Sequence, residues 1–202
     1  VASALTPVAQ YILLYHLQVK SLKGFSAKEI AGLIPYSYES TTLGITCLED
    51  VGLCEKIQDG PRRKILRFPC KGMELWKKAG QVLISPLEKR FYCEGIRTDK
   101  EYPACGINAL AHYTWLNPDP ERMLMLTSKE YRSLKSAEAF DSPNVFDGKI
   151  IVEVWKYPVI KMAEENKEWV DRLSLALSLG NDDDPRIEKE VERMINDIQW
   201  KD

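Results

Sequence analysis

The sequence predicts an α+β protein built from two small domains, and three observations lead to this prediction. Residues 26–52 have the pattern of two short helices that are joined by a tight turn and closed by Gly52. Residues 53–68 have the pattern of a strand, a basic turn and a return strand. Residues 89–198 then mix strand-like and helix-like segments. Together they predict an N-terminal winged helix-turn-helix domain over residues 1–84 and a small mixed α/β domain over residues 85–202.

The first two helices are predicted from their end signals. Thr6 can cap a helix that begins at Pro7, because proline at the first helical position has no amide to satisfy. This helix is apolar as far as Val19, and Gly24 is expected to end it. Ser26 and Glu29 have the spacing of a capping box that opens the second helix. Its apolar face and its stop are expected at Ile30, Leu33, Ile34 and Pro35.

The third helix is predicted to begin after Ser37 and to end at Gly52, which suits a left-handed stop. Its inner face recurs every three or four residues, at Thr41, Gly44, Ile45, Leu48 and Val51. Because Thr41 and Gly44 are small, we expect the second and third helices to approach closely there. A hairpin follows, with strands over 53–57 and 65–68 and a turn over 58–64.

A DNA contact is expected on the third helix and on the hairpin turn. Hydroxyl groups can meet bases and phosphates, and basic side chains at a wing tip can meet phosphates. The expected DNA-binding residues are Ser37, Tyr38, Ser40, Thr42, Thr46, Arg62, Arg63 and Lys64. The third helix, however, has no Lys or Arg and carries Glu39, Glu49 and Asp50. The alternatives are therefore a protein-interaction or dimerisation module, and an ordinary solvated turn in place of a wing.

Charge is divided unevenly along the chain, although the net charge is only −2. Residues 1–84 hold 11 Lys+Arg and 7 Asp+Glu, a balance of +4, whereas residues 85–202 hold 17 and 23, a balance of −6. A basic first part and an acidic second part suit a DNA-binding end and a partner end. With neither a signal peptide nor an apolar run of membrane length, we expect a cytoplasmic protein with no membrane partner. Because the chain begins at Val1, whether a further segment precedes it stays an open question.

Catalytic and metal-binding patterns are weak. The five cysteines have no C-x-x-C spacing, which favours free thiols over a zinc site. Cys105 and His112 could form a nucleophilic pair, but no third residue is placed to orient it. The Asp-rich loop 181–184 is better explained by Asp184 capping the last helix than by a metal. We therefore expect no enzymatic activity, no cofactor and no metal, with an enzyme as the remaining alternative.

The second domain is predicted from shorter signals. Residues 73–79 should form a helix ended by Gly80, and residues 81–86 the joint between the domains. Strands are expected over 89–95, 123–126 and the strongly β-branched 150–155. Helices are expected over 104–116, over 128–134 with Ser128 as its cap, and over 170–179. A last helix should bury Ile187, Val191, Met194, Ile195 and Ile198.

Three segments of the chain resemble the AbiEi-type antitoxins, which are the repressor halves of type IV toxin–antitoxin pairs. They are LISPLEKRFY at 83–92, ACGINALAHYTWLN at 104–117 and KEY at 129–131. The ending, VDRLSLALSL at 170–179 through DPRIE at 184–188 to Trp200, resembles a variant described as a MarR-like regulator.

The resemblance implies a winged helix-turn-helix followed by an antitoxin domain. It implies a repressor that binds double-stranded DNA at its own promoter, and a functional link to a nucleotidyltransferase-like toxin without a stable complex. The alternative is a ligand-sensing repressor whose second domain binds a small molecule. A neighbouring toxin gene would favour the first hypothesis and a metabolic operon the second. The oligomeric state, the operator and the toxin's identity stay open.

Overall fold

The computed structural model describes residues 3–162 and 168–201, which form an α+β protein. The chain divides into two compact units, which are described separately below. Unit 1 is Val1–Ile84 with Gln199–Asp202, and unit 2 is Ser85–Ile198. The division falls after residue 84, and the last four residues group with unit 1 although the sequence analysis placed them in the second domain.

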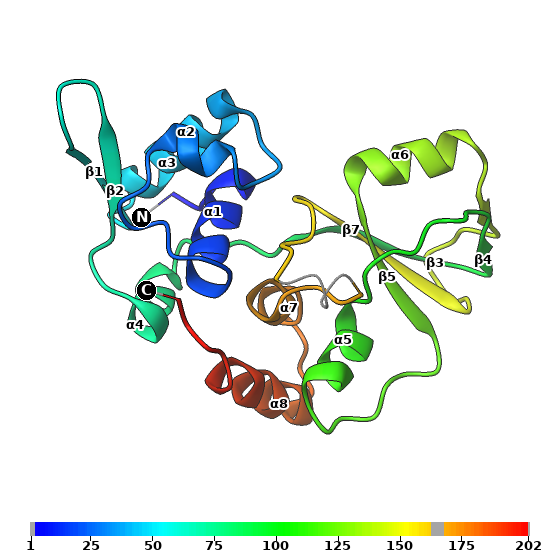
Figure 1. The fold of residues 1–202 in the computed structure, drawn as a ribbon. Coiled ribbons are helices and arrows are strands. Elements are labelled where there is room, and N and C mark those ends of the chain that lie inside the picture. The colour runs from blue at the N-terminus through cyan, green and yellow to red at the C-terminus, as the bar shows by residue number, and fades with distance from the viewer. Residues whose placement is uncertain (1–2, 163–167, 202) are drawn as a thin grey trace. The chain divides into compact units, whose positions relative to one another are not determined.

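Unit 1 begins with three helices, α1 (Pro7–Gln18), α2 (Ala27–Ala31) and α3 (Tyr38–Asp50). A two-stranded antiparallel hairpin follows, β1 (Glu55–Gln58) and β2 (Lys64–Arg67), and then α4 (Gly72–Ala79). The hairpin extends away from the helices (Figure 1). The three predicted caps are confirmed: Thr6 caps α1, Ser26 and Glu29 form a capping box on α2, and Ser37 caps α3.

Helix α1 is the centre of the unit 1 core, with Ile12, Leu13 and Leu14 fully buried. The glycine at position 44 explains how closely α3 approaches it. A Cβ at position 44 would lie 2.9 Å from Ile12 Cδ1 and 3.3 Å from the Ala9 nitrogen. Gly44 therefore faces α1, and our expectation that it serves an approach to the second helix was wrong.

The second helix is shorter than predicted. It ends at Ala31, before Pro35 is reached, and Leu33 is 38% exposed instead of lying on an apolar face. The preceding connection also differs, because α1 already ends at Gln18. Gly24, with φ +82°, donates its N–H to the Leu66 carbonyl at 2.9 Å. Gly24 thus joins this connection to the hairpin and does not stop a helix.

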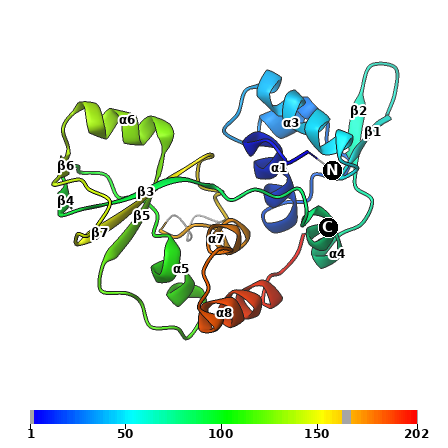
Figure 2. The ribbon, with the colours of Figure 1, turned by 180° about the vertical axis from the view of Figure 1, so that it is seen from behind.

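Unit 2 is built on a three-stranded sheet in the order β3-β7-β5 (Figure 2). Strand β3 (Leu87–Cys93) is antiparallel to β7 (Ile150–Trp155), and β5 (Arg122–Thr127) is parallel to it. All six residues of β7 are buried because it is the central strand. A second, two-stranded sheet pairs β4 (Gly95–Ile96) with β6 (Phe140–Asp141).

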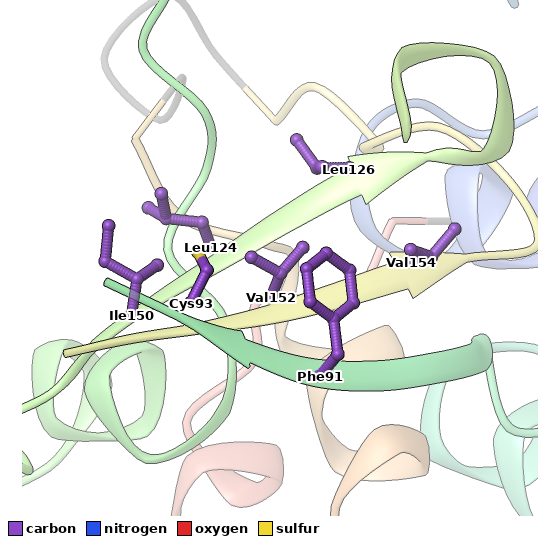
Figure 3. Close-up of a cluster of buried hydrophobic side chains, with 7 residues drawn as sticks. All are labelled: Phe91, Cys93, Leu124, Leu126, Ile150, Val152 and Val154. Carbon is purple, nitrogen blue, oxygen red and sulfur yellow. The ribbon is translucent and has the colours of Figure 1, made fainter. Parts of the chain in front are cut away.

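One face of the three-stranded sheet carries an apolar cluster (Figure 3). Its buried members are Phe91, Cys93, Leu124, Leu126, Ile150, Val152 and Val154. Tyr131 and Leu134, from α6 (Ser128–Ser136), pack against it. Alternation along the strands explains the cluster, because residues two apart on β3, β5 and β7 point to the same face.

The remaining helices of unit 2 are α5 (Gly106–Tyr113), α7 (Arg172–Ser178) and α8 (Pro185–Asn196). Helix α5 is shorter than predicted, and Trp115 beyond its end is 92% exposed. Thr127, and not Ser128, caps α6, in a capping box with Glu130. Asp184 caps α8 as predicted. Of the seam predicted to be buried, only Met194 and Ile198 are, whereas Ile187, Val191 and Ile195 are half-buried.

An ion pair with a buried carboxylate and a partly exposed guanidinium lies on the other side of the same sheet, in a register that places Arg90 opposite Glu153. Glu153 is fully buried, and Arg90 donates to its Oε2 from Nε at 3.2 Å and from Nη2 at 2.6 Å. Trp155 Nε1 donates to the other carboxylate oxygen at 3.1 Å. The carboxylate therefore has partners on both of its oxygens, which a buried charge requires.

The last described residues return to unit 1. The Lys201 N–H donates to the Leu17 carbonyl at 2.9 Å. Trp200 lies over Gly72, where a Cβ would be 3.4 Å from the Trp200 Cβ and Cγ atoms. Gly72 has φ +56°, a backbone conformation that favours glycine.

Candidate nucleic-acid interface

A groove of about 620 Å³ opens in unit 1 between α2, the first turns of α3 and one face of the hairpin. Its wall includes Ser26 and Ala27 from the start of α2, and Tyr38 and Thr42 from α3. Five basic side chains line it: Lys28, Lys56, Arg62, Arg63 and Lys64. The groove therefore gathers cations from α2 and from the hairpin, two segments that lie far apart in the sequence.

The hairpin register explains how the strands contribute. Lys56 pairs with Leu66, and Gln58 pairs with Lys64. Residues paired across a hairpin point to the same face, as do residues two apart on one strand. All four residues therefore share one face, and Leu66, which is buried, forms part of the groove wall. Lys64 belongs to β2, so it lies beside the turn in which it was predicted.

Arg63 is held by acceptors from three places. Its Nη2 lies 2.5 Å from Glu29 Oε1, and its Nη1 lies 3.1 Å from Asp59 Oδ2. Nη2 also reaches the Gly24 carbonyl at 3.5 Å. Hydrogen bonds from the Ser26 backbone and side chain, then the bond from Arg63, lower the pKa of the Glu29 carboxyl. Glu29 thus remains ionised while it serves both the α2 capping box and Arg63.

The other four cations differ in their pairing. The Lys56 Nζ atom lies 3.5 Å from Glu49 Oε1 on α3. Lys28, Arg62 and Lys64 make no ion pair with any residue that the structure describes. These three side chains are thus the ones available to an anionic ligand.

On α3, the predicted hydroxyls are mostly engaged with the backbone. Thr42 Oγ1 donates to the Tyr38 carbonyl at 2.9 Å, and Thr46 Oγ1 donates to the Thr42 carbonyl at 3.0 Å. Ser37 Oγ accepts from the Ser40 N–H at 3.1 Å as the helix cap. In these positions the two threonines can only accept a further hydrogen bond, whereas the Ser37 hydroxyl can still donate one.

The predicted site residues do not all come together. Tyr38, Thr42, Arg62, Arg63 and Lys64 line the groove, whereas Ser37, Ser40 and Thr46 are outside its lining. The Tyr38 side chain is 59% exposed, so its hydroxyl is accessible.

Helix α3 also presents an outer face away from the core. Positions 39, 43, 46 and 50 are spaced three or four apart and all four residues are exposed, with Leu43 at 64%. Glu39 and Asp50 carry carboxylates, Leu43 is apolar, and the Thr46 hydroxyl donates inward. This face therefore offers hydrogen-bond acceptors and one apolar side chain, and its charge is negative.

Sequence reasoning missed Lys28 and Lys56. Lys28 lies two positions after the Ser26 cap, in the first turn of α2. Its closeness to the predicted helix start was a local signal that could have been used. Lys56 could have been found only from the hairpin register, because alternation places it on the face of Gln58. Glu29 was assigned to capping alone, and nothing local indicates its contact with Arg63, which is 34 residues away.

The other candidates lie apart from the groove. Cys105 is fully buried, and burial followed by the Glu153 charge raises the pKa of its thiol well above 9.0. A nucleophilic cysteine needs a lowered pKa, and His112 is instead stacked on Trp169 with ring centroids 3.5 Å apart. All five cysteines are free. No group of His, Cys, Asp or Glu suited to a metal ion occurs within residues 3–162 and 168–201.

Comparisons with models of protein families, with curated proteins and with solved structures find no match. Among the described residues, no helix is both long enough and apolar enough to cross a membrane. The kind of ligand is therefore inferred from the side chains of the groove alone. Its unpaired cations and the exposed Tyr38 hydroxyl suit a ligand with closely spaced negative charges.

Proposed function

We propose that the protein is a DNA-binding transcriptional regulator, and that unit 1 is a winged helix-turn-helix. In this proposal α3 is the recognition helix and the β1–β2 hairpin is the wing. The observation that carries it is the basic groove between α3 and the hairpin, where Lys28, Arg62 and Lys64 are unpaired among the described residues. Phosphates of one DNA strand would lie along these cations, which supplies affinity and register and no sequence choice.

Base choice would come from α3, whose outer face limits what it can read. Glu39 and Asp50 can accept from the amino groups of cytosine and adenine, and Leu43 can meet a thymine methyl. No Lys or Arg on α3 is available for the two acceptors of guanine. An operator for this helix should therefore present cytosine or adenine amino groups, and thymine methyls, where α3 enters the major groove.

A mobility-shift series tests the proposal. The labelled duplex is the protein's own upstream region, a shuffled duplex is the competitor, and the salt concentration is varied. Three phosphate contacts give a slope of log K against log salt of about −3, because each contributes close to −0.9. Selective binding with such a slope supports the proposal. Equal, salt-independent affinities for both duplexes would favour the protein-interaction module instead.

We also propose that the protein is an autorepressing type IV antitoxin that acts at its own promoter. In this proposal unit 2 is the antitoxin part, which counters a nucleotidyltransferase-like toxin without forming a stable complex with it. The resemblance of residues 83–92, 104–117 and 129–131 supports this proposal. Co-expression with a toxin-like neighbouring gene tests it, because the antitoxin should restore growth. If no such gene lies nearby, a ligand-sensing repressor replaces it.

A further inference from the structure

The hairpin turn carries two arginines in succession whose surroundings differ. Arg63 reaches Glu29 on α2, Asp59 on its own turn and the Gly24 carbonyl before α2. Arg62 has no ion-pair partner in the described part of the chain. Sequence alone treats the two as equivalent phosphate ligands, but their contacts assign them different tasks.

We propose that Arg63 is a positioning residue: its link to Glu29 holds the hairpin against the start of α2 and sets the opening of the groove, while Lys28, Arg62 and Lys64 contact phosphate. This inference rests on the proposed function of the groove. A guanidinium suits the task because its planar fork can serve several acceptors at once.

The partner of Arg63 explains why it does not itself contact phosphate. Glu29 is fixed by the capping box, where its Oε1 accepts from the Ser26 N–H at 3.2 Å and from the Ser26 hydroxyl at 2.9 Å. If Arg63 left for a phosphate, this fixed carboxylate would remain beside the groove wall and repel the DNA backbone. The pair therefore neutralises Glu29 and joins two walls of the groove in one contact.

Replacement of Glu29 by Gln separates positioning from direct contact. Glutamine can keep the capping box at this position, so α2 stays intact. The change also removes a negative charge and frees Arg63. If Arg63 were a phosphate ligand, Glu29→Gln would tighten DNA binding. As a positioning contact, its loss should weaken binding by about two- to five-fold, the range of an exposed ion pair.

The salt dependence supplies a second readout. Arg62→Gln should reduce the slope of log K against log salt by about one. Arg63→Gln should weaken binding while leaving that slope unchanged, and Arg63→Lys should restore part of the affinity because lysine can still pair with Glu29. A slope lowered by one in Arg63→Gln, or tighter binding by Glu29→Gln, overturns the proposal.

Hydrogen exchange distinguishes this inference from the proposed function, because it needs no DNA. The Asp59 N–H donates to the Arg63 carbonyl at 2.8 Å, and the Leu66 N–H to the Phe25 carbonyl at 2.9 Å. Both amides should exchange faster in Glu29→Gln, by more than the slight shift of its unfolding midpoint accounts for. Unchanged exchange rates refute the positioning role. If the wild-type protein binds no DNA at all, the proposed function fails and the exchange rates still decide the role of Arg63.

Discussion

Among the described residues, each unit contains one Arg–Glu pair with a hydrogen-bond contact of 2.5–2.6 Å, and the two pairs lie in opposite surroundings. The Arg63 and Glu29 side chains are 47% and 46% exposed. The Glu153 side chain is fully buried, and the Arg90 side chain is 42% exposed. Their geometry is therefore similar, whereas the amount of water around each carboxylate differs greatly.

The difference teaches which pair can be altered without loss of the fold. Water screens the exposed pair, so its removal shifts local geometry more than stability. Burial lowers the pKa of Arg90, but the charge and hydrogen bond of Glu153 together outweigh this effect and raise it above its ordinary value. The buried carboxylate has no water to replace its partners, so unit 2 depends on the whole pair.

The largest effect is expected from removing the buried carboxylate. Glu153→Ala leaves Arg90 and the Trp155 N–H without their acceptor and opens a cavity in the central strand. We expect a loss of about 3 kcal/mol in the free energy of unfolding, the lower end for a broken buried pair because Arg90 is partly exposed. Urea unfolding measures this loss, with Glu29→Gln as the matched control in unit 1. Equal unfolding midpoints for both variants would contradict the comparison.

A second prediction concerns the unpaired cations beside the exposed pair. Replacement of both Arg62 and Lys64 by Ala should reduce the slope of log K against log salt by about two. The matched control is Lys77→Ala with Lys78→Ala, which removes two exposed cations of α4 outside the groove lining. Mobility shifts at several salt concentrations compare the two double variants. An equal loss from both would show that general charge, and not the groove, attracts DNA.

The thiol beside the buried pair gives a third prediction. Because burial and the Glu153 charge raise the pKa of Cys105, it should resist alkylation by iodoacetamide at pH 8 in the native protein. Cys47 and Cys70 are partly exposed and should react first. Mass spectrometry of the modified peptides measures the order. Rapid labelling of Cys105 in the native protein at pH 8 would show that the sheet opens there.

The smallest effect is expected from pH. The pKa of Glu29 is lowered below 4.5, so its contribution to stability is complete above that value and is lost as the pH falls through the folded pKa. Unfolding midpoints of the wild-type protein and of Glu29→Gln should therefore differ slightly at neutral pH and converge in acid. A constant difference down to pH 2 would show that the Glu29 charge has no role.

Local chemistry allowed much of this structure to be predicted. Thr6, Ser26, Ser37 and Asp184 each lie where a helix begins, because a side-chain oxygen can satisfy a free amide only there. The strand over 150–155 was predicted from its β-branched residues, which pack well in a sheet, and it is the central strand.

Long-range contacts could not be predicted in this way. The Arg63–Glu29 pair joins residues 34 apart, and the role of Gly44 depends on Ile12, which lies on another helix. The exposed Trp115 shows the same limit, since an aromatic residue in an apolar run predicts burial until the end of the helix is known. The cations of the groove were thus predicted in part, and their pairing not at all.

The return of Trp200 and Lys201 to α1 and α4 makes unit 2 an insertion within unit 1. The chain leaves unit 1 after Ile84 and re-enters it at Gln199, so two covalent segments connect the units. A fragment that begins at residue 85 and keeps the last residues would carry an indole whose partner, Gly72, is missing. An isolated unit 2 should therefore end at Ile198, and an isolated unit 1 needs residues 199–202 supplied through a short artificial linker.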